Sequence, residues 1–171
     1  MSKEKNYKNY EDVTKKWLEK ATPNSHDIVM RNYYIHNKVK YVVDGYNVVL
    51  KPSEKEVEIA QWLKEKLGGQ ISILPKINVP TNIQTADYLF RGQKFDLKSL
   101  TGQNNSLLYS RIRKSKGQSK NFIFDITCSP LTIHEIKRQV RSVYDKDNLI
   151  WFDIIIIKKE ENIIGIYQRK N

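Results

Sequence analysis

Two aspartates and one lysine near the middle of the chain have the types and spacing that phosphodiester hydrolysis requires. Asp87 begins one apolar run, and Asp96 and Lys98 lie two residues apart in the next run. Side chains of a strand alternate between its two faces, so Asp96 and Lys98 are expected to point to the same side. Two converging carboxylates need a cation between them, and their hard oxygen atoms suit Mg²⁺ or Mn²⁺. Lys98 would then orient or activate a water molecule, or balance charge on the phosphate.

A predicted β-hairpin brings these residues together. Its turn is expected at Gly92-Gln93, where glycine allows the positive φ of a tight turn. This turn places Asp87 opposite Lys98 or one position beyond it, which gathers both acids and the lysine in one cluster. The competing interpretation is an exposed hairpin face that carries only a weak surface ion pair. The two strands of the predicted hairpin are residues 87–91 and 94–100.

The elements around this hairpin alternate between helices and strands. The helix in front of it begins at Ser53, has Glu56 at capping-box spacing, and ends at Gly68-Gly69. Together the elements indicate an α/β fold in which helices flank a mixed central sheet. The other predicted elements are a helix over residues 10–21, a hairpin of residues 39–43 and 46–50 about Asp44-Gly45, a strand over 71–74, a loop over 75–85, a basic helix around 107–112, a strand over 122–126, a helix over 133–144, and strands over 150–157 and 163–167.

Positive charge is concentrated in one short segment. The chain carries 30 Lys and Arg against 19 Asp and Glu, a formal net charge of +11. A basic cluster concentrates polyanions and releases their counterions on binding, so this segment is the expected phosphate-contacting surface. The alternative is a solvated helix face that only keeps the protein in solution. The five cations of the basic cluster are Arg111, Arg113, Lys114, Lys116 and Lys120.

Composition excludes several other classes of protein. With 171 residues and 39% hydrophobic content, one compact domain is expected. No window of about 18 uncharged apolar residues exists, so no membrane span is predicted. Residues 1–10 lack the apolar region of an export signal. Cys128 is the only cysteine and cannot form an internal disulfide, which fits a protein of the reducing cytoplasm.

The ordered set of these residues resembles the PD-(D/E)xK nuclease superfamily. Within it, residues 39–169 are most similar to the C-terminal nuclease domains of contact-dependent growth inhibition (CDI) toxins, relatives of which occur on phage proteins and integrative conjugative elements. One departure is Ala86, because the residue before the first acid is normally proline. The segments that carry the resemblance are Val43-Asp44-Gly45, residues 56–60, Leu74-Pro75, residues 86–88, residues 96–98 and residues 118–125.

The resemblance implies a restriction-endonuclease-like core with metal ligation by Asp87 and Asp96 and a catalytic role for Lys98. It also implies a helix carboxylate, either Glu56 or Glu58. Glu56 is favoured because apolar residues at i+4, i+7 and i+11 from it form the core-facing stripe, although it could serve only as a cap. Gln118 resembles a glutamine that binds phosphate or positions water in such sites, and it could instead end the basic helix.

Substrate and partner also follow from the resemblance alone. It favours RNA, and tRNA in particular, over DNA, and it implies a cognate immunity protein with an acidic binding face. If the chain is a toxin domain, its place of action is the cytoplasm of a target bacterium. Residues 39–171 would form the nuclease domain, and residues 1–38, which lie outside the resemblance, would add an N-terminal helical extension.

Two other functions fit parts of the sequence. A metal-independent ribonuclease would use histidines as general acid and base, and the chain has three, at His26, His36 and His134, far apart in sequence. A non-catalytic nucleic-acid-binding module would need only the basic cluster.

Overall fold

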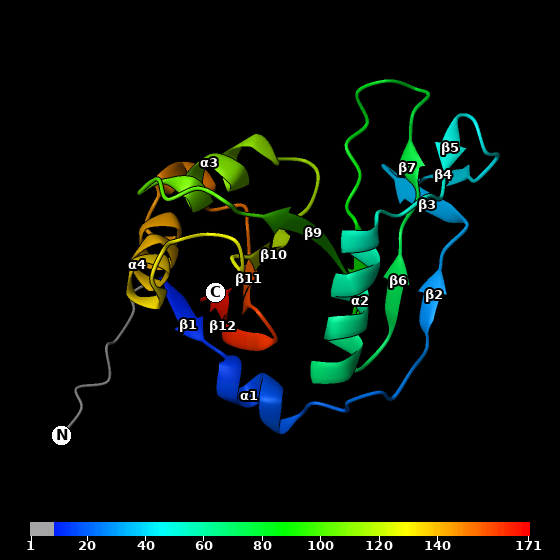
Figure 1. Ribbon diagram of the computed structural model, residues 1–171. Helices are drawn as coiled ribbons and strands as arrows, with labels where there is room; N and C mark the ends of the chain where they lie inside the picture. The colour runs from blue at the N-terminus through cyan, green and yellow to red at the C-terminus, as the bar shows by residue number, and fades with distance from the viewer. Residues whose placement is uncertain (1–8) are drawn as a thin grey trace.

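An eight-stranded mixed sheet forms the centre of the computed structural model, which describes residues 9–171 (Figure 1). Strand β10 is parallel to both β9 and β11, and β2 is parallel to β6, while the other neighbours are antiparallel. The expected mixed α/β architecture is therefore confirmed. In spatial order the strands are β1 (Tyr10–Asp12), β12 (Asn162–Arg169), β11 (Ile154–Lys159), β10 (Asn121–Asp125), β9 (Gln93–Ser99), β8 (Tyr88–Phe90), β6 (Ile71–Ile73) and β2 (Ile28–Met30).

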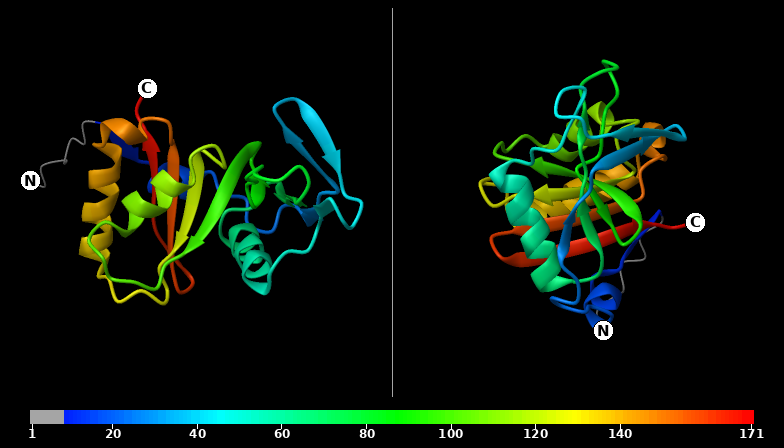
Figure 2. Two further views of the ribbon diagram at one scale, coloured as in Figure 1. Left: turned by 90° about the horizontal axis from the view of Figure 1, so that it is seen from above. Right: turned by 90° about the vertical axis from the view of Figure 1, so that its right-hand side faces the viewer.

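Helices cover both faces of the sheet (Figure 2). Helix α2 (Glu54–Lys66) packs on one face, where the short α1 (Thr14–Glu19) also lies; α3 (Leu107–Lys114) and α4 (Ile133–Tyr144) pack on the other. Because side chains alternate along a strand, Ile123 of β10 enters the core under α2, while Phe122 enters the core under α3 and α4. A 3-10 turn, Asp147–Leu149, leads into β11.

A small substructure beside the main sheet carries four short strands. Strand β3 (Tyr33–His36) pairs with β4 (Val39–Val42), and β5 (Val48–Val49) pairs with β7 (Lys76–Ile77). The hairpin predicted about Asp44-Gly45 is wrong, because its turn lies earlier, at Asn37-Lys38, where both residues have positive φ. Asp44 instead accepts three backbone N–H groups through Oδ1 and shapes a loop.

The N-terminal segment differs from the expected helical extension. Residues 10–12 form the edge strand β1 instead of the first turn of a helix, because they pair with β12. Residues 28–30 form the opposite edge strand, so both edges of the sheet come from the segment 1–38. Residues 1–8 of that segment lie outside the described residues. No helix that the structure describes is long and apolar enough to span a membrane.

The close approach of Gly68 to Thr22 gives a prediction about stability. Gly68 follows α2 with φ +65°, and a Cβ there would lie 1.8 Å from the backbone oxygen of Thr22. Gly92 has a similar φ of +79° but faces open space. We expect Gly92→Ala to cost about 1–2 kcal/mol of unfolding free energy for its left-handed backbone. Gly68→Ala should lower the free energy of unfolding, measured in urea, by clearly more than this. Equal losses for the two variants would contradict a role for the close approach of Gly68 to Thr22.

Candidate active site

The register of the β8–β9 hairpin sets the position of the two acids. Tyr88 pairs with Phe95 around a turn at Arg91-Gly92, both with positive φ, so the turn lies one residue earlier than predicted. The expected placement of Asp87 opposite Lys98 is therefore wrong, since this register carries Asp87 toward Asp96.

Both acids are buried on the sheet face that α3 and α4 cover in part. Asp96 is 1% exposed and lies beside Phe122 in the parallel register of β9 and β10. Asp87, just before β8, is 7% exposed, and its Oδ2 accepts the Leu97 backbone N–H at 2.7 Å. Buried carboxylates in such a position are costly unless other groups compensate their charge.

Lys76 supplies part of this compensation. Its Nζ contacts Asp87 Oδ1 directly and lies 3.9 Å from Glu56 Oε2. Lys76 lies on β7, in the segment predicted as a loop, and its pairing with Val49 brings it to the site. No local pattern in the sequence distinguishes this lysine from the many others, and sequence reasoning missed it.

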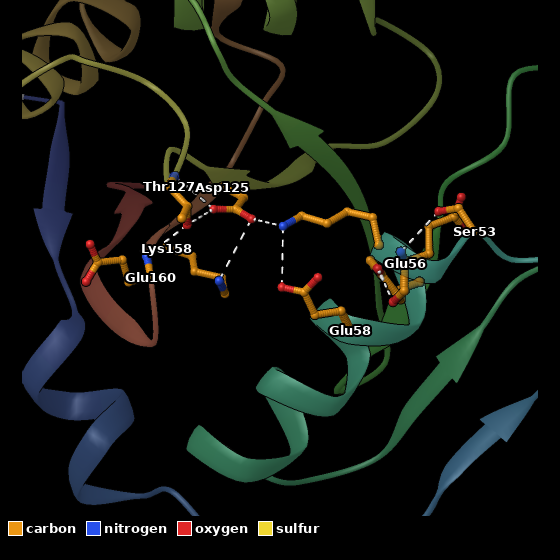
Figure 3. A network of polar contacts seen from close by, with 9 residues as sticks. Ser53, Glu56, Glu58, Asp125, Thr127, Lys158 and Glu160 are labelled. Carbon is orange, nitrogen blue, oxygen red and sulfur yellow. Dashed lines mark hydrogen bonds and ion pairs between the residues drawn. The ribbon is translucent and has the colours of Figure 1, made fainter.

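The structure separates the two candidate helix glutamates. The Glu56 side chain is 17% exposed and is directed to Lys76, and the Tyr88 hydroxyl donates to the Glu56 backbone oxygen at 2.6 Å. The Glu58 side chain is 56% exposed and lies 3.4 Å from Lys55 (Figure 3). The geometry therefore favours Glu56 as the helix carboxylate of the cluster.

Lys98 and Gln118 border the same cluster. Lys98 Nζ lies 2.8 Å from Asp96 Oδ2, on the side to which alternation directs both residues. The Gln118 amide donates to the Thr85 backbone oxygen at 2.9 Å, two residues before Asp87. Gln118, which follows the end of α3, thus ties this loop to the backbone just before Asp87 instead of only closing that helix.

The two aspartates have opposite pKa shifts. Burial raises the pKa of Asp96 to about 7, with a further contribution from Asp87 and an opposing one from Lys98. Burial alone would raise the pKa of Asp87, but a hydrogen bond with Asp96 and the Lys76 ammonium lower it. Burial also raises the pKa of Glu56, against the charge of Lys76. The two aspartates therefore lose their protons at different pH, Asp87 before Asp96.

The acid cluster offers oxygen donors of the type that hard divalent cations prefer. Glu56 Oε2 is a buried atom without a hydrogen-bond partner, Asp96 Oδ2 is buried against the Lys98 ammonium, and all three carboxylates offer oxygen ligands. Within residues 9–171, no group of three or more histidine, cysteine, aspartate or glutamate side chains is arranged to hold a metal ion. In this arrangement the Lys76 and Lys98 ammonium groups are the cations that contact the cluster.

The expected basic surface divides into two parts. Arg111, Arg113 and Lys114 lie exposed on α3, whereas Lys116 and Lys120 lie in the loop after it and line a pocket of about 570 Å³. None of the five forms an ion pair with any carboxylate that the structure describes. Their charge is thus available to a ligand.

Asp125 belongs to a separate polar network on the α2 face (Figure 3). Its side chain is 2% exposed, and Oδ2 lies 2.5 Å from Lys55 Nζ and 3.8 Å from Lys158 Nζ. Thr127 donates to Oδ1 from its backbone N–H and its hydroxyl. Asp125 is therefore the hydrogen-bonded acid of a strand end, and the network ties the first turn of α2 to the sheet.

The histidines lie on three different parts of the fold. His26 contacts the Ser25 hydroxyl, His36 ends β3, and His134 lies in the first turn of α4. No hydrogen bond joins two histidines in the described part of the chain. This arrangement does not support the histidine-based ribonuclease.

Comparisons with known proteins agree with part of the sequence interpretation. Residues 84–163 match the family model of the contact-dependent growth inhibition CdiA C-terminal domain, a span that includes Asp87, Asp96, Lys98 and Gln118 but not Glu56. This match supports the resemblance to CDI toxin domains, whereas the PD-(D/E)xK assignment stays a prediction.

A solved structure and the curated proteins complete these comparisons. The chain is similar to a CdiA-CT/CdiI toxin and immunity complex from Burkholderia pseudomallei, with a TM-score of 0.55 and 19% sequence identity. The alignment covers 82% of this chain and 98% of that chain, and at this identity it establishes a shared fold. No curated protein gives a significant match.

Proposed function

We propose that this chain is a CDI-type toxin domain that acts as a metal-dependent endonuclease. One observation carries the proposal: two buried aspartates with opposite pKa shifts lie on one hairpin, with Lys98 at 2.8 Å from Asp96. Perturbed acids gathered in this way are typical of catalytic sites. The match of residues 84–163 to a toxin domain family adds independent support.

Each residue of the site would have a separate role in the proposed hydrolysis. Asp87, Asp96 and Glu56 would hold Mg²⁺ or Mn²⁺, which when bound stabilises charge on the phosphate and lowers the pKa of a water. The Lys98 ammonium beside Asp96 places positive charge where a phosphate gains negative charge during hydrolysis. The Gln118 amide would position the phosphate or the water. The exposed cations of α3 would hold the nucleic-acid backbone.

Substrate and partner belong to the same proposal. RNA, and tRNA within it, is favoured over DNA by the likeness to CDI toxin domains. The solved relative is described as a toxin and immunity complex, so we propose a cognate immunity protein here as well. With a net charge of +11 on this chain, an acidic binding face on that partner would be complementary.

The proposal is tested by incubating the purified chain with total RNA and with plasmid DNA, each with Mg²⁺, Mn²⁺ or EDTA. The Asp96→Asn protein serves as the inactive variant, and Asp147→Asn, at an exposed aspartate, serves as its matched control. We expect discrete RNA cleavage that needs metal, disappears with Asp96→Asn and persists with Asp147→Asn.

Other outcomes would point to the alternatives. Metal-dependent cleavage of DNA alone would change the substrate. Cleavage that survives both EDTA and Asp96→Asn would overturn the metal site and favour the histidine-based ribonuclease. Tight, salt-sensitive binding without any cleavage would favour the binding module.

A further inference from the structure

The pocket that Gln118, Lys116 and Lys120 help to line has walls from four separate segments. They are the turn of the β3–β4 hairpin, the start of β9, residues 116–121 from the loop after α3 to the start of β10, and Trp151 before β11. Its volume of about 570 Å³ lies within the range of small-molecule sites. No acidic residue lines it.

One wall is aromatic and held in place. Trp151 is half-buried, and its ring meets Phe122 and Phe152 edge-on, with centroids 6.2 and 6.3 Å away. An indole fixed by such contacts loses little further freedom when a planar ligand stacks on it. Base–aromatic stacking is the common, sequence-tolerant way in which proteins hold single-stranded nucleotides.

Another wall is cationic and unpaired. Lys116 and Lys120 line the pocket from exposed positions, and neither forms an ion pair with a described residue. Lys94 is already engaged, since its Nζ donates to the Ile35 backbone oxygen at 3.0 Å and so ties the hairpin to β9. Two free ammonium groups beside an indole are complementary to a phosphate attached to a base.

The floor of the pocket is rigid and polar. The Ser119 hydroxyl donates to the Lys94 backbone oxygen at 2.7 Å, and Asn121 Nδ2 donates to the same oxygen at 3.0 Å. Asn121 Oδ1 also accepts the Ile154 backbone N–H at 3.1 Å. Both side chains are buried, so these hydrogen bonds set the shape of the site before any ligand enters.

Gln118 connects this pocket to the acid cluster. It lines the pocket, and its amide donates to the Thr85 backbone oxygen, two residues before Asp87. We infer that the pocket binds one nucleotide of the substrate strand, next to the phosphate at the acids. The base stacks on Trp151, and the phosphate of that nucleotide contacts Lys116 and Lys120. This inference deepens the proposed nuclease function and rests on it.

The test measures binding to the Asp96→Asn protein, so that it needs no cleavage. Nucleoside monophosphates, ribose 5-phosphate and short RNA trinucleotides are titrated and followed by NMR chemical shifts. We expect Trp151→Leu to weaken nucleotide binding roughly 5- to 100-fold, the loss of one base–aromatic stack, and Trp151→Phe to retain most of the affinity. Ribose 5-phosphate should bind more weakly than the nucleotides and be insensitive to Trp151→Leu.

A charge-matched pair of variants tests the phosphate contact. Lys116→Gln/Lys120→Gln should weaken both nucleotides and ribose 5-phosphate, whereas Lys20→Gln/Lys137→Gln, at exposed lysines elsewhere, should not. If trinucleotides bind more tightly than monophosphates and show the same dependence on Trp151, the nucleotide in the pocket belongs to a nucleic-acid strand. If trinucleotides bind no more tightly, the ligand is a free nucleotide, and the assignment of the pocket to the substrate strand is overturned.

The inference and the proposed function fail in different ways. Equal affinity in all variants, or no binding, would overturn the nucleotide pocket even if the wild-type chain cleaves RNA. Loss of binding with Trp151→Leu in a chain that cleaves neither RNA nor DNA would support the pocket and overturn the nuclease.

Discussion

Glu56→Gln is expected to lower the rate of RNA cleavage by roughly two to three orders of magnitude. The metal ion that Glu56 would help to hold stabilises the charge of the transition state by several kcal/mol. Glu58→Gln, two residues away on the same helix, should leave the rate nearly unchanged. Glu56 is directed to Lys76 beside Asp87, whereas Glu58 is exposed and pairs with Lys55. Single-turnover cleavage at saturating Mg²⁺ measures both variants.

The substitution is chosen so that folding is preserved. Glutamine can replace glutamate three residues after a helix N-cap, and the Ser53 hydroxyl accepts the backbone N–H of residue 56 in either case. Equal urea midpoints for the wild type and both variants would confirm this. Calorimetric titration with Mn²⁺ should show weaker binding for Glu56→Gln alone. A slow Glu58→Gln enzyme beside a normal Glu56→Gln enzyme would assign the role to the other glutamate.

Asp125→Asn is expected to lower the free energy of unfolding by about 3–5 kcal/mol, since it leaves a buried charge without its partner. Lys158 is only 2% exposed, and the Asp125 carboxylate lies 3.8 Å from its ammonium. Urea unfolding at pH 7 measures the loss. Asp147→Asn, at an exposed position, should be nearly neutral, and Lys158→Met in the Asp125→Asn protein should restore part of the stability.

The same pair of proteins gives a pH dependence with a definite sign. Burial opposes ionisation of Asp125, but hydrogen bonds from Lys55 and Thr127 outweigh it and lower its pKa. A carboxyl with a lowered pKa in the folded state stabilises the protein above its unfolded pKa and loses this contribution as the pH falls. The advantage of wild type over Asp125→Asn should therefore be full at pH 7 and shrink below about pH 4, the ordinary aspartate range. An advantage that grows on acidification would contradict this assignment.

The sequence predicted the features that depend on neighbouring residues. The Ser53 cap marks the start of α2, and the glycines after Lys66 mark its end. The apolar spacing of residues 133–144 predicted α4 with the bounds that the structure has. Strand alternation placed Asp96 and Lys98 on one side, where they lie 2.8 Å apart. Caps, glycines and periodicity act within a few residues, so one sequence carries enough information to locate them.

Only the tertiary structure decided which distant segments pair and which side chains they bring together. Positive φ at Arg91 moved the hairpin turn by one residue, which brought Asp87 toward Asp96 instead of Lys98. Lys76 reaches the acids only because β7 pairs with β5. Residues 10–12, helical by local pattern, became an edge strand because β12 offered hydrogen bonds. Local propensities are worth only fractions of a kcal/mol per residue, so pairing and burial override them where distant segments meet.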